Sequence, residues 1–155
     1  MQQNGHRDQN NKMGGPTVPD ANAQAKILGS ETELNGVLFV LFIPSKDQKG
    51  KDLRDQDMWA NAAGDMLTNI FGGSTEMPPA KGKWLNDKTK EIITEKIILI
   101  HSYARESDAN NEDKIRVLAS FLHRMGKETN QGEVAVVIDG VFHRIRKFNL
   151  IEVKK

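Results

Sequence analysis

The stretch that decides the fold reads VAVVIDGVFHRI, at residues 134–145. Two apolar runs of strand length flank the pair Asp139-Gly140. This pair favours a two-residue turn, because such turns need positive φ angles at their central positions and glycine adopts these without strain. The stretch therefore predicts an antiparallel hairpin, with one strand before Asp139 and another from Val141 onward.

Working outward from this hairpin, two further patterns predict strands. Residues 37–43 form a continuous apolar run that ends at Pro44, which is typical of a central strand covered on both faces. The segment around Trp84, the turn-prone pair Asn86-Asp87 and residues 92–103 predict a second hairpin.

Two segments have the apolar spacing of helices. The first lies between Asp55, which suits an N-cap, and Gly72, which suits a helix end. The second is expected to begin near Ser107 or Asp108 and to end at Gly126. Its acidic start and basic end both suit the helix dipole.

The resulting order is strand, helix, strand, strand, helix, strand and one more strand. This order predicts an α+β fold, namely a ferredoxin-like βαββαβ sandwich with an extra C-terminal hairpin strand. An open α+β sheet with another strand order is the alternative. A sheet in so small a domain leaves one face uncovered, and we therefore expect a homodimer.

The composition indicates one domain. The chain has 155 residues, of which 37% are hydrophobic, and this suffices for a single core. We place a single α/β domain at residues 34–155. Residues 1–33 are rich in glutamine, asparagine and glycine and hold few large aliphatic side chains, so a disordered N-terminal tail is expected.

Charge and cysteine content exclude several classes of function. The 22 basic and 21 acidic side chains give a net charge of +1, so no global field attracts nucleic acid or anionic membranes. The sequence has no cysteine, which excludes disulfides, cysteine-based zinc sites and thiol nucleophiles. It also lacks the apolar segments of a signal peptide or a membrane span, so we expect a cytoplasmic location and no membrane partner.

Polar side chains at the end of the second predicted helix, and in the loop after it, suit a ligand site. Cations there could bind an anionic ligand, while carboxylates could orient water or a hydroxyl group. An imidazole and a phenol at the end of a predicted strand could act as general base and acid. The alternative is that the basic residues complement the helix C-terminus and the glutamates are solvated. The predicted ligand-binding residues are His101, Tyr103, His123, Arg124, Lys127, Glu128, Gln131 and Glu133.

A second hypothesis is a metal-dependent hydrolase or nuclease. Asp139 followed by Glu152-Val153-Lys154 is similar to the core of the PD-(D/E)xK nuclease superfamily, in which acids hold a divalent ion and a lysine activates water. This hypothesis would also use Glu133. However, an extended strand rising roughly 3.3 Å per residue would place Glu152 on the order of 35 Å from Asp139. The four histidines lack the spacing of metal ligands, so no metal site is predicted.

A third hypothesis is a nucleic-acid-binding accessory protein. Arg144, Arg146 and Lys147 alternate with Phe142 and Phe148 in a local basic strip that could contact phosphates. Basic residues on an exposed edge strand also prevent aggregation between sheets, and this is the structural alternative.

One segment supports a family resemblance. The segment RMGKETNQGEV, residues 124–134, together with the hairpin behind it, resembles a stretch of uncharacterised small bacterial proteins. The plan from Leu38 to Val137, including Gly82-Lys83-Trp84, is similar to a bacterial domain family of unknown function. The resemblance implies the α/β hairpin plan and no catalytic residue.

We interpret the chain as a non-catalytic cytosolic binding or accessory domain. It would act through a protein partner or a small polar ligand near residues 123–133. No catalytic triad, metal cluster or cofactor loop is recognisable, so no cofactor is expected, and the sequence leaves open whether the protein is an enzyme. Trp59 and Trp84 are interpreted as packing residues.

Overall fold

The structure, a computed structural model, describes residues 20–31 and 36–149. The chain divides into two compact units, Met1–Leu34 and Asn35–Lys155, and each is treated by itself. In the first unit, helix α1 (Ala21–Leu28) lies within the segment for which the sequence predicted disorder. Asp20 caps its first turn by accepting from the N–H groups of Asn22 and Ala23, and Gly29 ends it with a φ of 62°. These two local signals were missed in the sequence.

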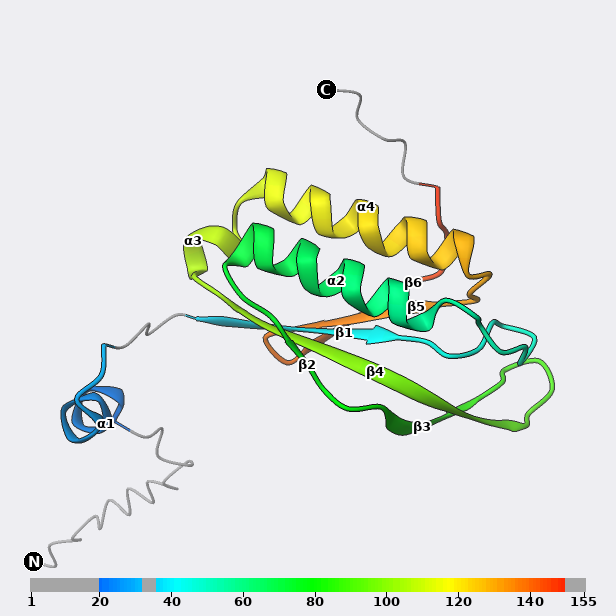
Figure 1. Cartoon of the computed structure of the whole chain (residues 1–155), viewed down its shortest axis with the longest axis horizontal. Coiled ribbons are helices and arrows are strands. Elements are labelled where there is room, and N and C mark those ends of the chain that lie inside the picture. Colours follow the sequence, from blue (N-terminus) through cyan, green and yellow to red (C-terminus); the bar gives the residue numbers. More distant parts are fainter. Residues whose placement is uncertain (1–19, 32–35, 150–155) are drawn as a thin grey trace, which may run out of the picture. The chain divides into compact units, whose positions relative to one another are not determined.

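The second unit is a mixed α/β structure with an antiparallel sheet of six strands, counted within the described residues (Figure 1). The strand order is β2-β4-β1-β5-β6, and β3 pairs with β4 beside β2. The strands are β1 (Val37–Ile43), β2 (Thr75–Glu76), β3 (Ala80–Leu85), β4 (Ile92–Ala104), β5 (Val134–Ile138) and β6 (Val141–Ile145).

The long strand β4 organises the sheet. Its second half pairs with the whole of β1, from Ile98 opposite Ile43 to Ala104 opposite Val37. Its first half pairs with β3 on the other side. The first half of β4 therefore extends past the end of β1, and β3 pairs with this extension.

Helices α2 (Gln56–Phe71) and α4 (Glu112–Glu128) lie side by side on one face of this sheet (Figure 1). Alternate residues of the strands point toward them and form the core, because successive side chains of a strand point to opposite faces. Each large side chain buried there stabilises the fold by roughly 1.5–3 kcal/mol. The most deeply buried side chains include Phe39, Leu41, Ile43, Leu67, Ile98, Ile100, Leu122 and Met125.

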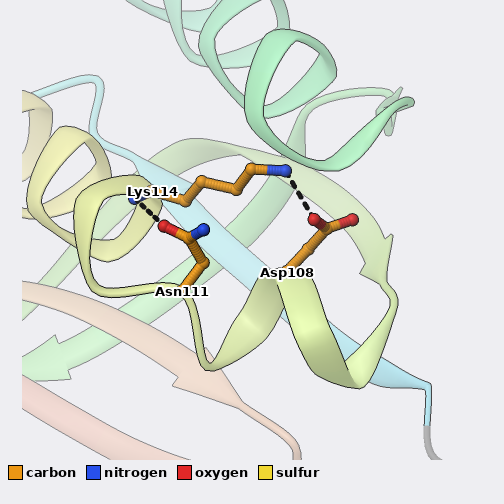
Figure 2. Close-up of polar contacts among 3 residues, drawn as sticks. All are labelled: Asp108, Asn111 and Lys114. Carbon is orange, nitrogen blue, oxygen red and sulfur yellow. Dashed lines mark hydrogen bonds and ion pairs between the residues drawn. The ribbon is translucent and has the colours of Figure 1, made fainter.

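The short helix α3 (Glu106–Ala109) leads into α4 through a polar junction (Figure 2). The side chain of Asn111 accepts a hydrogen bond from the N–H of Lys114 at 3.2 Å and so caps α4. The ammonium group of Lys114 reaches back to the carboxylate of Asp108 at 2.5 Å. The long helix thus begins at Glu112, later than the predicted start near Ser107 or Asp108, because the Asn111 cap is the stronger start signal.

The predicted hairpin is confirmed. Asp139 and Gly140 have φ angles of 49° and 81°, as the two-residue turn requires, and β5 pairs with β6 from Val134 opposite Ile145 to Ile138 opposite Val141. The predicted end of α4 at Gly126 is wrong, since the helix continues to Glu128. Gly126 serves close packing instead, because a Cβ there would lie 2.3 Å from the ring of Phe148.

The face of the sheet opposite the helices carries half-buried apolar side chains, including Leu38, Val40, Phe42 and Leu99. The homodimer expected from such a face stays a prediction. Among the helices of residues 20–31 and 36–149, none combines the length and apolarity needed to cross a bilayer.

Candidate functional site

A hollow of about 310 Å³ lies on the open face of the sheet, and we call it the sheet pocket. Five strands, β1, β3, β4, β5 and β6, and the segment before β5 contribute to it, so its walls come from both ends of the domain sequence. Phe42 and Ala135 line its floor, since both lie on the face away from the helices. The lining residues are Phe42, Pro44, Lys83, Trp84, Glu95, Ile97, Gln131, Glu133, Val134, Ala135, Phe142 and Arg144.

Glu95 is the buried acid of this pocket, with 4% of its surface exposed. Its Oε2 accepts hydrogen bonds from the backbone N–H groups of Ser45 and Lys46, each at 3.1 Å. Its Oε1 is buried and has no hydrogen-bond partner among the described residues. Buried polar atoms are nearly always paired, so an unpaired carboxylate oxygen beside a hollow marks a position where a ligand group would be stabilised.

The environment of Glu95 changes its protonation. Burial raises the pKa of this carboxyl group, although the two backbone donors and the nearby Lys46 act to lower it. Desolvation dominates because a charged carboxylate loses more hydration than two N–H groups restore. A cation placed beside Oε1 would favour the charged form and oppose this shift.

Gln131 supports the segment that holds Glu95. The side-chain Nε2 of Gln131 donates to the carbonyl oxygen of Lys46 at 2.9 Å, and the N–H of the same Lys46 donates to Glu95. Gln131 is 6% exposed, so this contact is shielded from water. Through Lys46, Gln131 fixes the position of the carboxylate.

Aromatic and aliphatic side chains form the pocket walls. The rings of Phe42 and Phe142 meet edge to face with centroids 6.4 Å apart. Trp84 lies across the pocket lining from them with 39% of its surface exposed. Ile97 reaches over β3 at Gly82, where a Cβ atom would come within 2.2 Å of its Cδ1. The walls therefore suit a flat or apolar ligand group.

The β6 side of the pocket is charged. The Oε2 of Glu133 accepts from Nε of Arg146 at 2.9 Å, and its Oε1 lies 3.8 Å from Nε of Arg144. The guanidinium of Arg144 also stacks over the ring of Phe142, 5.2 Å from its centroid. Its partner Glu133 raises the pKa of the exposed Arg146 side chain. Arg146 thus holds Glu133 at hydrogen-bond distance and also interacts with the charge of Asp87, whereas Arg144 has only the longer contact with Glu133.

The groups of the sheet pocket are suited to binding a small ligand that carries both charged and flat apolar parts. A buried acid suits a cation, aromatic faces attract both cations and flat rings, and arginine suits an anion. Pockets of this size, mostly apolar with a few convergent polar groups, are typical small-molecule sites.

The comparisons with known proteins bear on the fold. No family model matches the sequence, and no curated protein sequence matches it either. Among solved structures, the chain is similar to a phage SAM lyase in complex with S-methyl-5′-thioadenosine, at 14% identity and a TM-score of 0.55, over 72% of this chain and 90% of that one. It is also similar to a phage SAM lyase in the apo state, at 15% identity and a TM-score of 0.53, over 81% of this chain and 98% of that one. At such identity the likeness shows a shared fold.

Of the ligand-binding residues predicted from sequence, the structure brings two to the sheet pocket, Gln131 and Glu133. His101 and Tyr103 lie instead in a separate, wider hollow of about 630 Å³, beside the segment from Phe71 to Thr75. Tyr103 is 73% exposed there. The predicted set therefore does not form one site.

The remaining predicted residues belong to α4. The ring of His123 meets that of Phe148 edge to face at 6.1 Å. The guanidinium of Arg124 lies over the ring of Trp59 at 5.4 Å, and this contact helps to cover the core. Lys127 and Glu128 are exposed in the last turn and line neither hollow.

The residues of the other two hypotheses are also dispersed. In the basic strip, Arg144 lines the sheet pocket, Arg146 pairs with Glu133, and Lys147 is exposed beyond β6. Glu152 and Lys154 lie outside the described residues. Within residues 20–31 and 36–149, histidine, aspartate and glutamate side chains form no group of three or more that could hold a metal ion.

Sequence reasoning missed Glu95 and assigned Trp84 to packing. Trp59 is a core residue as interpreted, with 2% exposure, whereas Trp84 lines the pocket. A signal for Glu95 was present, because it occupies an alternate position of β4 in phase with Ile93 and Ile97. An acid in phase with the apolar residues of a strand is expected to be buried with them, as Glu95 is.

Proposed function

We propose that the chain binds a small nucleoside ligand with a cationic centre in the sheet pocket, and we name S-adenosylmethionine as the candidate. The observation that carries this proposal is the buried, unpartnered Oε1 of Glu95 beneath aromatic walls. A sulfonium is a cation with three carbon substituents, so it fits a buried carboxylate in an apolar setting better than a strongly hydrated ammonium does. The flat adenine ring suits the faces of Trp84 and Phe142.

The structural likeness supports the choice of ligand. Both similar structures are SAM lyases, and one of them holds S-methyl-5′-thioadenosine. This proposal keeps the interpretation of the chain as a small-ligand binding domain, with the site moved from residues 123–133 to the sheet pocket.

For the fold, we propose that the core follows the ferredoxin-like plan. The strand order β3-β4-β1-β5 and the position of the two long helices on one face of the sheet support this proposal.

Calorimetric titration of the full chain with S-adenosylmethionine tests the proposal. We expect saturable binding that Glu95→Gln weakens at least about tenfold, equivalent to about 1.4 kcal/mol. This variant removes the charge while keeping the shape and the acceptor for the two N–H groups. Glu76→Gln is the matched control, because Glu76 is an exposed acid of β2 that lines neither hollow.

Two results would contradict the proposal. One is the absence of heat and of any melting-temperature shift at millimolar ligand, since a ligand of the native state must raise the melting temperature. The other is an equal loss of affinity in the Glu95 and Glu76 variants, which would indicate a general charge effect.

A second candidate function is cleavage of the same ligand, favoured by the likeness to SAM lyases. In such a cleavage the ligand's own carboxylate would attack the chain carbon bonded to sulfur. That carbon–sulfur bond breaks with its electron pair going to sulfur, which yields the neutral thioether S-methyl-5′-thioadenosine and the lactone of the amino-acid chain. Incubation of the full chain with S-adenosylmethionine, followed by chromatography, tests it. If the wild type forms the thioether faster than the Glu95→Gln variant does, the result supports a lyase. Equal rates would support binding without cleavage.

A further inference from the structure

On the charged β6 side of the sheet pocket, Arg144 has hydrogen-bond donors that no described residue uses. Arg144 contacts Glu133 through Nε, at 3.8 Å, and places the face of its guanidinium over Phe142. Its two terminal amino groups make no hydrogen bond to a described residue. They are therefore available as the two-pronged donor that arginine presents to a carboxylate.

The partner of Arg144 is already engaged. Glu133 accepts a hydrogen bond at 2.9 Å from Arg146, whereas its distance to Arg144 exceeds that of a hydrogen bond. Among the described residues, the longer contact with Glu133 is the only ion pair of Arg144, and the Phe142 ring orients the Arg144 side chain without neutralising it. The pocket lining thus offers an acid at Glu95 and, at Arg144, a cation with unused hydrogen-bond donors.

We propose that Arg144 binds the carboxylate of an amino-acid ligand, so that the sheet pocket selects a zwitterionic sulfonium over analogues that lack the carboxylate. This inference rests on the proposed function and names the substrate class more narrowly. S-adenosylmethionine has both charges, a cationic sulfur and a carboxylate on the same short chain. Its thioether product lacks both, and its decarboxylated form retains only the cationic groups.

The test compares three ligands by calorimetric titration of the full chain at one pH and ionic strength: S-adenosylmethionine, its decarboxylated form and S-methyl-5′-thioadenosine. We expect the first to bind at least about tenfold more tightly than the second, since a charge-assisted arginine–carboxylate pair contributes about 1.4 kcal/mol or more. In Arg144→Gln this ratio should fall to about twofold or less, because the variant loses affinity for the first ligand only.

Lys127→Gln is the matched control. Lys127 also carries a positive charge, but it is exposed in the last turn of α4 and lines neither hollow. The ligand ratio should therefore stay at the wild-type value in this variant. Circular dichroism and melting curves establish that each variant is folded.

The outcomes separate the two proposals. If none of the three ligands binds, the proposed function fails and the role of Arg144 falls with it. If they bind but the wild type does not distinguish the first from the second, the role of Arg144 is overturned while the ligand site stands. Retention of the ratio in Arg144→Gln, or its loss in Lys127→Gln, overturns that role in the same way.

Discussion

Glu95 has two oxygens in different surroundings. The Oε2 atom accepts hydrogen bonds from two backbone N–H groups, and the buried Oε1 atom has no partner among the described residues. Burial raises the pKa of the carboxyl group above its ordinary value of 4.5, so the folded state holds the proton to a higher pH than the unfolded chain does. The stability from this proton is fully present below the unfolded pKa and is lost as the pH rises through the folded pKa.

The loss of stability with rising pH gives a prediction for Glu95→Gln in the absence of ligand. Glutamine does not titrate, so the variant does not lose stability in this way. The free energy of unfolding of the variant, relative to that of the wild type, should therefore increase as the pH rises above about 4.5. Urea denaturation at several values between pH 4 and 8 measures the difference. The same series for Glu76→Gln should show no such trend, and a difference that is constant with pH for Glu95→Gln would refute the assignment.

Binding has the opposite pH dependence. A cationic ligand stabilises the charged carboxylate, so the affinity for S-adenosylmethionine should rise with pH through the pKa of Glu95 in the free protein. The affinity for the neutral thioether should lack this rise. Titrations with both ligands at pH 5 and pH 8 distinguish the two cases, and parallel changes for the two ligands would argue against a cation beside Glu95.

At the scale of elements, the pairing of β3 with β4 shapes the pocket. Gly82 lies opposite Glu95 in this pair, and the side chain of Ile97 occupies the space where a Cβ of residue 82 would stand. The missing side chain thus allows Ile97 to lie over β3 and to form part of the pocket wall.

Gly82→Ala should therefore destabilise the domain by about 1–2 kcal/mol through overpacking. Thermal or urea unfolding measures this, and the double variant with Ile97→Ala should not show the additional loss caused by the clash. Gly73→Ala is the control, since a Cβ at Gly73 meets no atom within 4 Å. If Gly82→Ala unfolds at the wild-type urea concentration, the contact does not constrain β3.

The start of α4 gives a second prediction at this scale. Asn111 caps the helix with its side chain, whereas Asp55 occupies the same position before α2 and makes no side-chain cap bond. Asn111→Ala should cost about 1 kcal/mol, and Asp55→Ala only a few tenths from the helix dipole. Urea denaturation of both variants measures the contrast, and equal losses would contradict the capping geometry in Figure 2.

At the scale of the whole molecule, stability resides in the second unit. Its core joins α2, α4 and the sheet, and Phe121 is 6% exposed there with its ring 5.8 Å from that of Trp59. In the first unit, helix α1 has no buried residue, and Ile27 and Leu28 are 86% and 75% exposed. The apolar surface that drives cooperative unfolding thus belongs to residues 36–149.

Two changes test this division. Phe121→Ala should lower the free energy of unfolding by about 3–5 kcal/mol, because it opens a cavity between α2 and α4. Deletion of residues 1–34 should leave the melting temperature nearly unchanged, since those residues make up a separate unit. A fall of the melting temperature on deletion comparable to that of Phe121→Ala would mean that the first unit is part of the same fold.

Local sequence signals determined most elements of the second unit. The apolar run of residues 37–43, the helix ending at Gly72 and the Asp139-Gly140 turn were all readable, because periodicity and glycine backbone preferences act within a few residues. Errors arose where two local signals competed, as at Gly126, which resembles a helix end and serves close packing.

The candidate site was decided by the tertiary structure. Gln131 and Glu133 were identified from sequence, but Glu95, Trp84 and Phe42 reach them only because the sheet places β3, β4, β1, β5 and β6 next to one another. Strand order depends on long-range pairing and on which faces the helices cover, and the spacing of residues along the chain does not contain it. The sequence by itself therefore determined the local elements, whereas tertiary packing created the buried carboxylate and the arginine that give the pocket its chemistry.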